Sequence, residues 1–576
     1  LHPFFVNMYL GLIISSLIIG YSYADYNDDT IGYAGMASAT NKMAADAAKE
    51  ILLKGGNAAD AAFAAQMVLN VVQPQSAGVG GGAFIMYYDA ATKQVSALDA
   101  REEAPKAFNE YVFCDDVTCY ETNGTSGDCD SCATIDGTER RTGGLSVGVP
   151  GTFYGFARLK QQFGSDDISW SELFDDAIDY AENGFDAYQG FVDGINGNID
   201  GLSRFESTCK LLLNYPDCDE SKYEVNDTVT NPDLAQTFMN LSAMDPDEAI
   251  EHFYTGAIAE AIVAKVKSAN NTVTGRNGLM ELEDLEQYRA VFREPVSSTI
   301  TFDGEDYTFY GMPMPSSGPL TLQYQLKLNR LLQTEYNDVD DFKNDATSTQ
   351  ALHFINSIQN IAFADRNQYM ADEDFVNVPV EGMLADSYIE ERMADEFLRD
   401  MAQALPVDYG FPDGWNETWE QSPTTESGTA HINIVDKDGN VASITTTIES
   451  IYGSFVVLDG YGFFLNNELT DFSAPGIVNG IKVANAPEGG KKYRRTAIGD
   501  DASTMGGKRP RSSMSPTIVF RSDGTPYLTA GARGGFLIIG EVFRVLTANL
   551  QYGMNIQQAV NTPRVFGVNS FRLVES

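Results

Sequence analysis

The sequence predicts an α+β protein, and three patterns along the chain support this class. Two alanine-rich amphipathic segments within 43–72, separated by a Gly-Gly-Asn break at 55–57, are typical of a pair of helices. The stretches 84–99 and 299–312 each have the pattern of two strands around a turn. From Thr429 onward the pattern becomes mainly strand, with hairpins separated by Gly, Asn and Asp.

The remaining elements follow in chain order. A glycine loop, Gly78–Ala83, joins the helix pair to the first strand, and a cysteine-containing loop follows the second one. Helical stretches then alternate with turns to about Met401, and the turn at 313–319 opens a further helix after the second strand pair. A polar run at 415–428 then separates this part of the chain from the strand-rich part.

Composition limits the classes of partner. The 576 residues include 81 acidic and 38 basic side chains, for a net charge of -43. Nucleic-acid binding requires clustered Lys and Arg, so this composition argues against it. The acidity is typical of a strongly solvated surface and indicates no particular site. The length corresponds to roughly four domains of average size, although a large layered fold also accommodates it.

The first 24 residues have the composition of a signal peptide or membrane anchor. The apolar run from Met8 to Gly20 suits a signal-peptide core, and small residues at 22–24 suit a cleavage position. An uncleaved anchor is the alternative, because the stretch 4–21 approaches the roughly 18 residues needed to span a bilayer. In either case we expect the body of the protein to be secreted or held on the extracellular face of the plasma membrane.

Six cysteines agree with export. Four lie within 114–132, and the others are Cys209 and Cys218. An even, clustered set in an exported chain favours disulfides, with the connectivity left open. The C-x4-C and C-x2-C spacings also suit a metal, but the loop is acidic and has no histidine. The four histidines of the chain are dispersed, so no metal site is predicted.

Two glycine motifs suggest other chemistries. Gly144–Gly148 matches the GxSxG nucleophile elbow, but Pro150 and Gly151 oppose the helix that must follow the serine, so a structural turn is favoured. Gly78–Ala83 resembles a dinucleotide-binding fingerprint, but the predicted order is helix, loop, strand rather than strand, loop, helix. A close approach of two backbones is therefore the favoured interpretation of that loop.

Thr429 begins the clearest hairpin of the sequence. HINIVD and VASITTTI alternate on either side of the turn at 437–440, and the polar run before them ends in Gly428. Taken alone, a threonine where a loop enters a sheet is most often an ordinary strand residue. Its interpretation changes because eight further motifs occur in a fixed order around it. These are GGNAADAA, SAGVGGGAF, LDAREEAP, SVGVPG and MPSSGP before Thr429, and GYGFFLNNELTDF, KRPRSSMSPTIVF and TAGARGGF after it.

In this order the motifs closely resemble the gamma-glutamyltransferase (gamma-glutamyltranspeptidase) family of N-terminal-nucleophile hydrolases, from about Tyr33 to Phe566. The resemblance implies a four-layer αββα sandwich and no metal or organic cofactor. It also implies self-cleavage between Gly428 and Thr429, which would give a heterodimer of chains 25–428 and 429–576. The freed α-amino group of Thr429, with an ordinary pKa of about 7.7 to 8, would act as the base for its own hydroxyl.

The resemblance also assigns a substrate pocket. Thr447 corresponds to the threonine that hydrogen-bonds the nucleophile, and Gly534 and Gly535 to the oxyanion pair. For the γ-glutamyl donor, Arg101 would bind the α-carboxylate, since a guanidinium fork suits a carboxylate. The remaining donor-binding residues implied are Ser512 and Ser513 for the carboxylate, and Glu468 and Asp471 for the ammonium. The expected substrates are glutathione and other γ-glutamyl compounds, with water, amino acids or dipeptides as acceptors.

The sequence departs from the family pattern in three places. Glu449 stands where the family often has an asparagine that helps to bind the ammonium, so it adds a carboxylate beside Glu468 and Asp471. The segment 476–508 is longer than is common and contains four basic residues near its centre. The chain also stops at Ser576, before the further strand and helix that family members usually have, so we expect the C-terminus to be truncated.

Two alternatives remain open from the sequence. One is an acylase of the same family that acts on other γ-glutamyl or glutaryl amides. The other is an exported relative that is never cleaved and serves only as a ligand-binding or surface protein.

Overall fold

The structure is a computed structural model, and it describes residues 35–115, 117–123, 125, 129, 140–270, 275–335, 345–393, 428–473, 477–478, 481–489, 492–493, 505–568 and 571–574. The predicted signal or anchor segment therefore lies outside the described residues, as do about half of 476–508 and the last two residues. Within the described residues, no helix has the length and apolar character needed to cross a bilayer.

The larger sheet combines strands from both sides of Gly428. Its order is β1 (Gly35–Ala39), β9 (Thr429–Asp436), β10 (Val441–Thr447), β2 (Gly82–Asp89), β3 (Gln94–Ala100) and β6 (Val291–Arg293), and every pair is antiparallel. The predicted hairpin at Thr429 is confirmed, and it lies between β1 and β2 rather than at an edge. The two parts of the chain thus share one hydrogen-bonded sheet.

A second sheet has four strands. Its order is β16 (Pro526–Ala530), β15 (Thr517–Arg521), β8 (Glu305–Gly311) and β7 (Val296–Phe302), again antiparallel. This sheet also joins the two sides of Gly428, because β15 pairs with β8.

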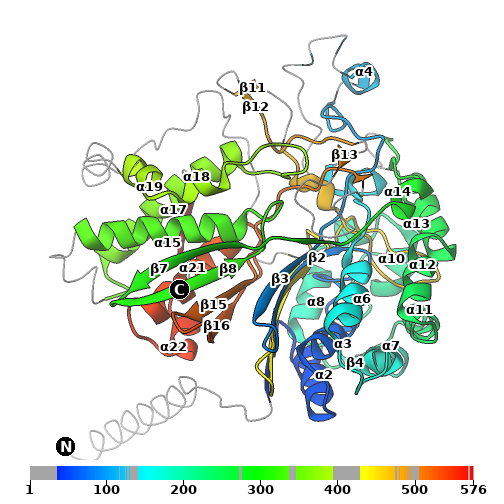
Figure 1. The fold of residues 1–576 in the computed structure, drawn as a ribbon. Coiled ribbons are helices and arrows are strands. Elements are labelled where there is room, and N and C mark those ends of the chain that lie inside the picture. The colour runs from blue at the N-terminus through cyan, green and yellow to red at the C-terminus, as the bar shows by residue number, and fades with distance from the viewer. Residues whose placement is uncertain are drawn as a thin grey trace, which may run out of the picture.

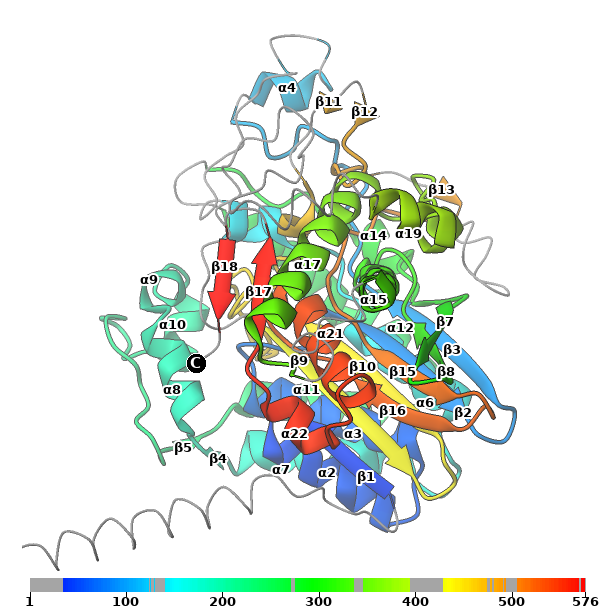
Figure 2. The same ribbon diagram turned by 90° about the vertical axis from the view of Figure 1, so that its left-hand side faces the viewer.

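Alternation along β2 explains how the sheets stack. Ile85 and Tyr87 belong to the core beneath α2 (Lys42–Leu53), α3 (Ala58–Val72) and α6 (Thr152–Phe163). Phe84 and Met86 point to the opposite face and share a core with the second sheet. That core also includes residues of α15 (Gly318–Glu335), α17 (Thr349–Tyr369) and α21 (Leu537–Leu550), which cover the outer face of the second sheet. Figures 1 and 2 show the resulting layers, so the four-layer αββα sandwich is confirmed.

The predicted helix pair is α2 and α3. Asn57 starts α3 with a capping box: its side chain accepts from the backbone of Asp60, whose carboxylate accepts from the backbone of Asn57. Every residue of α3 is buried, and the helix lies against the larger sheet.

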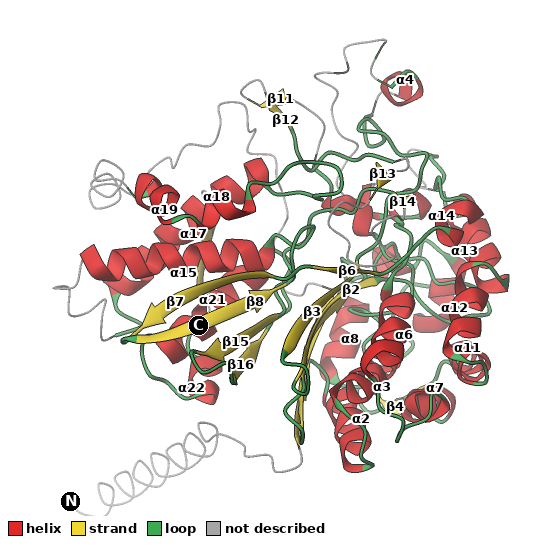
Figure 3. Cartoon of the chain, in the orientation of Figure 1, coloured by secondary structure: helices red, strands yellow, loops and turns green. Residues whose placement is uncertain are grey.

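Shorter elements complete the described chain (Figure 3). The helices are α4 (Val117–Glu121), η2 (Gly144–Ser146), η3 (Ser171–Phe174), α7 (Asp175–Glu182), α8 (Gln189–Asn196), α9 (Ile199–Leu202), α10 (Glu206–Leu212), α11 (Pro232–Ser242), α12 (Pro246–Tyr254), α13 (Ala257–Ser268), α14 (Leu282–Glu286), α18 (Val380–Leu384), α19 (Asp386–Arg392), η4 (Glu468–Asp471) and α22 (Ile556–Asn561). The short strands pair as β4 (Phe185–Asp186) with β5 (Thr228–Val229), β11 (Ile477–Val478) with β12 (Ile481–Lys482), β13 (Lys492–Tyr493) with β14 (Met505–Gly506), and β17 (Val565–Val568) with β18 (Phe571–Val574).

Two expectations from the sequence need comment. The strand-rich character after Thr429 holds for the hairpins, but α21 interrupts it with 14 residues of helix. Its residues are largely apolar, and five of the 14 are β-branched, which suits a strand locally; burial against the second sheet favours the helix instead. The preference for disulfides is confirmed by the bonds Cys119–Cys129 and Cys209–Cys218.

Candidate active site

The predicted nucleophile lies at one end of the larger sheet. Thr429, the first residue of β9, is directly opposite Thr447, the last residue of β10, and Thr447 is opposite Gly82, the first residue of β2. Arg101 follows the last residue of β3. Because neighbouring strands are antiparallel, these strand starts and ends meet at the same edge of the sheet. The topology therefore brings together residues more than 300 positions apart.

Thr447 links the hydroxyl of Thr429 to the peptide bond before it. The Oγ1 of Thr447 lies 2.8 Å from the carbonyl oxygen of Gly428, 2.8 Å from the backbone nitrogen of Glu449 and 3.2 Å from the Oγ1 of Thr429. A hydroxyl has one proton and two lone pairs. The proton of Thr447 is donated to the carbonyl, so its oxygen accepts from Glu449 and from Thr429. Thr429 is thereby oriented with its proton toward Thr447.

Gly428 fits a site where only glycine is tolerated. A Cβ atom built on Gly428 would overlap the carbonyl of Ser450 and would lie 2.7 Å from the carbonyl oxygen of Glu449. A larger residue would displace the carbonyl that Thr447 polarises. This steric constraint gives a physical reason for the glycine at the predicted cleavage position.

Arg101 is bracketed by two acids. Its Nη1 donates to Glu468, its Nη2 donates to Asp471 at 2.6 Å, and its Nε donates to the Pro510 carbonyl at 3.1 Å. The side chains of Arg101 and Glu468 are almost fully buried, whereas Asp471 keeps 24% of its side-chain surface exposed. The structure thus brings three of the predicted donor-binding residues into direct contact.

Burial and the charge of the ion-pair partner act in opposite directions on the pKa of each of these groups. Burial alone would lower the pKa of Arg101, but Glu468 and Asp471 overcome it and raise the pKa above its ordinary value. Burial raises the pKa of Glu468 well above normal, against the attraction of Arg101 and with the help of neighbouring carboxyls. The result is a permanently charged guanidinium beside a carboxyl that resists ionisation.

Ser512 and Ser513 lie next to this group. The backbone carbonyl of Arg511, immediately before them, accepts from Arg101 at 3.4 Å. Ser513 Oγ accepts from Nη2 of Arg366 at 2.6 Å, so its own proton remains for a ligand. Ser512 Oγ accepts from the backbone of Met514 at 3.1 Å.

The predicted oxyanion glycines lie beyond β16. Thr529 donates to Asn433, and a Cβ on Gly531 would overlap the ring of His431, so the chain leaving β16 runs toward the start of β9. Gly534 and Gly535 follow with φ of +131° and +58°, a conformation that side chains disfavour. Their role as donors to an oxyanion stays a prediction.

Comparison with known proteins identifies the family. The profile described as Gamma-glutamyltranspeptidase matches residues 44–573. The chain belongs to the gamma-glutamyltranspeptidase family.

Similarity to individual proteins agrees with this family assignment. The protein is 32% identical to the Glutathione hydrolase proenzyme of Bacillus subtilis over 559 residues, which cover 96% of this chain and 84% of the relative. It is 30% identical to the Escherichia coli protein of the same name, over 92% of this chain and 80% of that one. Among solved structures, gamma-glutamyltranspeptidase of Helicobacter pylori matches with a TM-score of 0.53 and 27% identity, over 63% of this chain and 92% of that chain. Cephalosporin acylase from Bacillus halodurans matches with a TM-score of 0.69 at 22% identity, over 94% and 85%, which shows the shared fold.

Glu449 is the residue at which this gamma-glutamyltranspeptidase chain departs from the expected pattern. It adopts a φ of +74°, its backbone donates to Thr447, and its carboxylate accepts from Ser450. Burial, followed by the charge of Asp471, raises the pKa of Glu449. The expected crowding of carboxyls is therefore present in this family member.

The glycine motifs have structural roles in this fold. Cβ atoms on Gly80 and Gly81 would overlap the backbone carbonyls of Phe464 and Thr447, which agrees with a close backbone approach. Ser146 of the GxSxG motif is fully buried and donates to the carbonyl of Gly143 at 2.8 Å. A buried hydroxyl bonded to backbone is not an exposed nucleophile, so the structural turn is the correct interpretation.

Sequence reasoning missed three buried residues beside the predicted donor-binding residues. Arg366, on α17, holds both Ser317 and Ser513 through its guanidinium. Arg511 donates to the carbonyl of Arg366 at 3.0 Å, and burial lowers its pKa to about 10. Glu102, next to Arg101, is completely buried. Arg366 lies inside a long helix and had no sequence signal, whereas Arg511 and Glu102 lay within motifs already selected.

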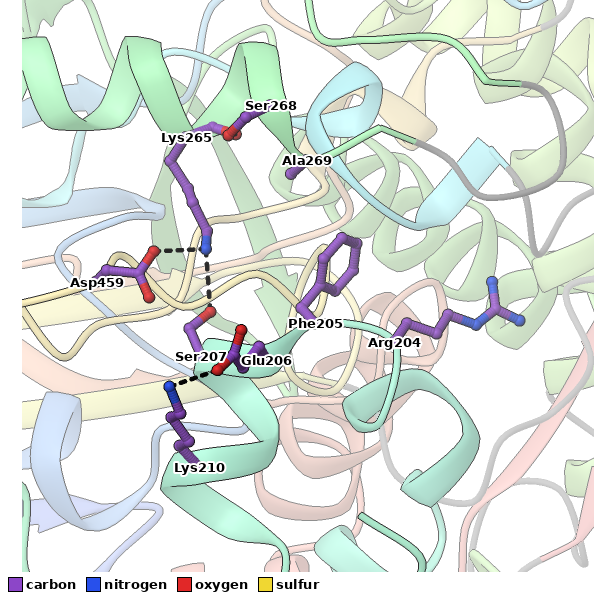
Figure 4. Close-up of a pocket in the computed structure, with 9 residues that line it drawn as sticks. All are labelled: Arg204, Phe205, Glu206, Ser207, Lys210, Lys265, Ser268, Ala269 and Asp459. Carbon is purple, nitrogen blue, oxygen red and sulfur yellow. Dashed lines mark hydrogen bonds and ion pairs between the residues drawn. The ribbon is translucent and has the colours of Figure 1, made fainter. Parts of the chain in front are cut away.

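A pocket on the surface, of about 250 Å³, lies elsewhere (Figure 4). It is lined by parts of α10 and α13 and by Asp459, and includes none of the predicted site residues. Its charges pair with one another: Lys265 contacts Asp459 at 2.7 Å, and Lys210 contacts Glu206 at 2.6 Å. This self-paired arrangement leaves little charge to attract a substrate.

Proposed function

We propose that this protein is a glutathione hydrolase and γ-glutamyltransferase that activates itself by cutting the Gly428–Thr429 bond. The observation that carries the proposal is the hydrogen-bonded series Thr429, Thr447 and Gly428, which aims a hydroxyl and polarises the adjacent carbonyl. Relatives at 30% to 32% identity named Glutathione hydrolase proenzyme support both the reaction and the precursor.

In self-cleavage, Thr429 Oγ1 attacks the carbonyl carbon of Gly428 and gives its proton toward Thr447. The C–N bond breaks, the nitrogen takes up a proton, and Gly428 is left as an ester on Thr429. Water then hydrolyses the ester, which gives a carboxylate on Gly428 and a free amino group on Thr429. In the ester, Thr429 Oγ1 has no proton to donate, and Thr447 keeps its hydrogen bonds with the Gly428 carbonyl and the backbone of Glu449.

In turnover, the freed amino group accepts the proton of Thr429 Oγ1 as this oxygen attacks the γ-carbonyl of the donor. The amine of the donor leaves with a proton, and a γ-glutamyl ester remains on Thr429. Water releases glutamate, or the amine of an acceptor takes the γ-glutamyl group. Backbone N–H groups of Gly534 and Gly535 would stabilise the oxyanion, a role worth about 2.7 to 4 kcal/mol per donor in other enzymes.

The donor would bind as a zwitterion. Its α-carboxylate would meet Arg101, Ser512 and Ser513, and its ammonium would meet Asp471, Glu468 and Glu449. Two carboxyls already contact Arg101, so a donor that brings a carboxylate without an ammonium would add negative charge to the site with no compensating positive charge. This arrangement favours γ-glutamyl over glutaryl donors.

A substrate panel separates the proposal from the acylase alternative. Purified protein is assayed with matched γ-glutamyl and glutaryl anilides, with and without an amino-acid or dipeptide acceptor. We expect turnover of the γ-glutamyl donor and a gain with acceptor. Equal or faster release from the glutaryl donor would overturn the zwitterion pocket and favour the acylase.

We also propose that the protein is exported, secreted or held on the extracellular face of the plasma membrane. Two disulfides support an oxidising compartment. Fractionation of the source cells tests this: recovery in the medium or on protease-accessible membranes is expected, and recovery only in the cytosol would contradict it.

A further inference from the structure

Glu102 occupies a closed space between two glycine motifs. A Cβ on Gly82 would overlap the carboxyl of Glu102, and a Cβ on Gly148 would lie 2.9 Å from the Cβ of Glu102. Gly82 comes from the glycine loop and Gly148 from the turn before α6. Both motifs thus leave room for the side chain of Glu102, which is completely buried.

The carboxyl of Glu102 lies within hydrogen-bonding reach of the carboxyl of Glu468 and of its own backbone N–H. No N–H or O–H group of another described residue donates to either carboxyl oxygen of Glu102 or to Oε2 of Glu468. The other oxygen of Glu468 accepts from Arg101. Two ionised carboxylates are only acceptors and would repel, whereas one shared proton makes them a hydrogen-bonded pair.

We propose that Glu102 is a positioning residue that shares one proton with Oε2 of Glu468, and that this hydrogen bond fixes Glu468 against Arg101 and toward the donor ammonium. The expected effect on donor binding rests on the proposed function, whereas the shared proton does not depend on it.

The electrostatic surroundings favour one proton on the pair. Burial raises the pKa of Glu102 to about 7, against the attraction of Arg101 and a hydrogen bond with Glu468. Burial also raises the pKa of Glu468, and Glu102, Asp471 and Glu449 add to it. Tyr254 and Tyr288, which also face Glu102, stay neutral because burial raises their pKa values well above 10.

Loss of the proton would weaken donor binding. Glu102 and Glu468 would then both be charged, in addition to Asp471, and the extra negative charge near Arg101 would compete with the α-carboxylate of the donor. Glu468 would also lose the hydrogen bond that orients it. We therefore expect the KM for the donor to rise as the pH increases through about 7. The kcat depends on Thr429, so we expect it to change less with pH than the KM does.

The test compares Glu102→Gln, Glu102→Ala and Glu373→Gln with the parent. Gln is an isostere of the protonated acid and donates at every pH. Glu373 is the matched control, since burial raises its pKa to about 7 beside Arg293, and none of the described hydrogen bonds or ion pairs of Arg101, Glu468 and Asp471 involves it. Infrared difference spectra between pH 6 and pH 8.5 report protonated carboxyl groups, and KM and kcat are measured for a γ-glutamyl anilide over the same range.

We expect Glu102→Gln to abolish the increase of KM with pH and to remove part of the infrared signal of the protonated acid. Glu102→Ala should raise KM about tenfold at pH 6, with kcat within about threefold, since it removes a hydrogen bond to a charged group. Glu373→Gln should keep the parent KM profile.

An unchanged infrared signal in Glu102→Gln would overturn the shared proton, whatever the substrate. A parental KM profile in Glu102→Gln, or a loss equal to that of Glu102→Ala, would overturn the positioning role. If the parent does not turn over the γ-glutamyl donor at all, the proposed function fails, and the infrared comparison still decides the protonation of Glu102.

Discussion

At the residue scale, the hydroxyl of Thr447 is the centre of the site. It contacts the nucleophile, the carbonyl before it and the backbone of Glu449 with all of its hydrogen-bonding capacity. One hydroxyl therefore both orients Thr429 and polarises the peptide bond to be cut.

Thr447→Val should slow self-cleavage and turnover by at least about tenfold, because it keeps the shape of the strand but removes an aligned hydrogen bond from the transition state. The measurement is the cleaved fraction on a denaturing gel over time. Thr446→Val is the control: Thr446 is the neighbouring residue on β10, is buried, and only donates to Gly82 at 3.3 Å. Equal cleavage rates for the two variants would contradict the role of Thr447.

Arg101→Ala should still be cleaved, since Arg101 does not contact the Thr447 network, but it should bind the donor poorly. It should also unfold more easily, by about 3 to 5 kcal/mol, because removing one partner of a buried ion pair leaves Glu468 uncompensated. Donor KM and a denaturant titration measure the two effects. A parental KM in a stable, cleaved Arg101→Ala protein would exclude Arg101 from the donor pocket.

Residue patterns alone did not reveal this site. Thr429, Arg101, Glu468 and Asp471 were selected from the order of whole motifs, and each one alone has an ordinary structural explanation. Arg366 was missed because a buried arginine inside a helix has no local signature. Its importance comes from packing between α17 and the Ser513 segment, which depends on the tertiary fold.

At the scale of elements, Asp436 stabilises the hairpin that carries Thr429. Its Oδ1 accepts from the backbones of Asp438 and Asn440, and its Oδ2 accepts from the backbone of Ala58 at 2.9 Å. The same carboxylate closes the turn and ties it to the first residue of α3.

Asp436→Ala should lower the free energy of unfolding by about 1.5 to 3 kcal/mol or more, since several hydrogen bonds to a charged acceptor are lost. Denaturant titration measures the change. Asp438→Ala, which changes an exposed residue of the same turn, should stay within about 0.5 kcal/mol of the parent. Similar losses in both variants would argue against the role of Asp436.

Local signals predicted most of these elements. Periodicity and the Gly-Gly-Asn break located α2 and α3, short strand-like runs around a turn located β2 and β3, and alternation located β9 and β10. Helix α21 was missed because its β-branched residues suit a strand, and the helical state is stabilised by packing on the second sheet.

At the scale of the whole molecule, both parts of the chain are interleaved. Strands β9 and β10 lie between β1 and β2 in one sheet, and β15 pairs with β8 in the other. The four layers depend on pairings between strands far apart in the sequence, so only the family resemblance predicted them.

After cleavage, the two fragments should therefore remain in one complex. We expect the two fragments to elute together in size-exclusion chromatography and to separate only in denaturant, because shared strands hold them. Fragments that separate under native conditions would contradict the shared sheets.

The most direct test of the account is N-terminal sequencing and intact-mass measurement of the purified protein after denaturation. We predict two fragments, the smaller beginning Thr-Ala-His-Ile-Asn at Thr429, and one uncut, inactive chain for Thr429→Ala. An active protein that stays uncut, or a Thr429→Ala protein with parental turnover, would contradict the account.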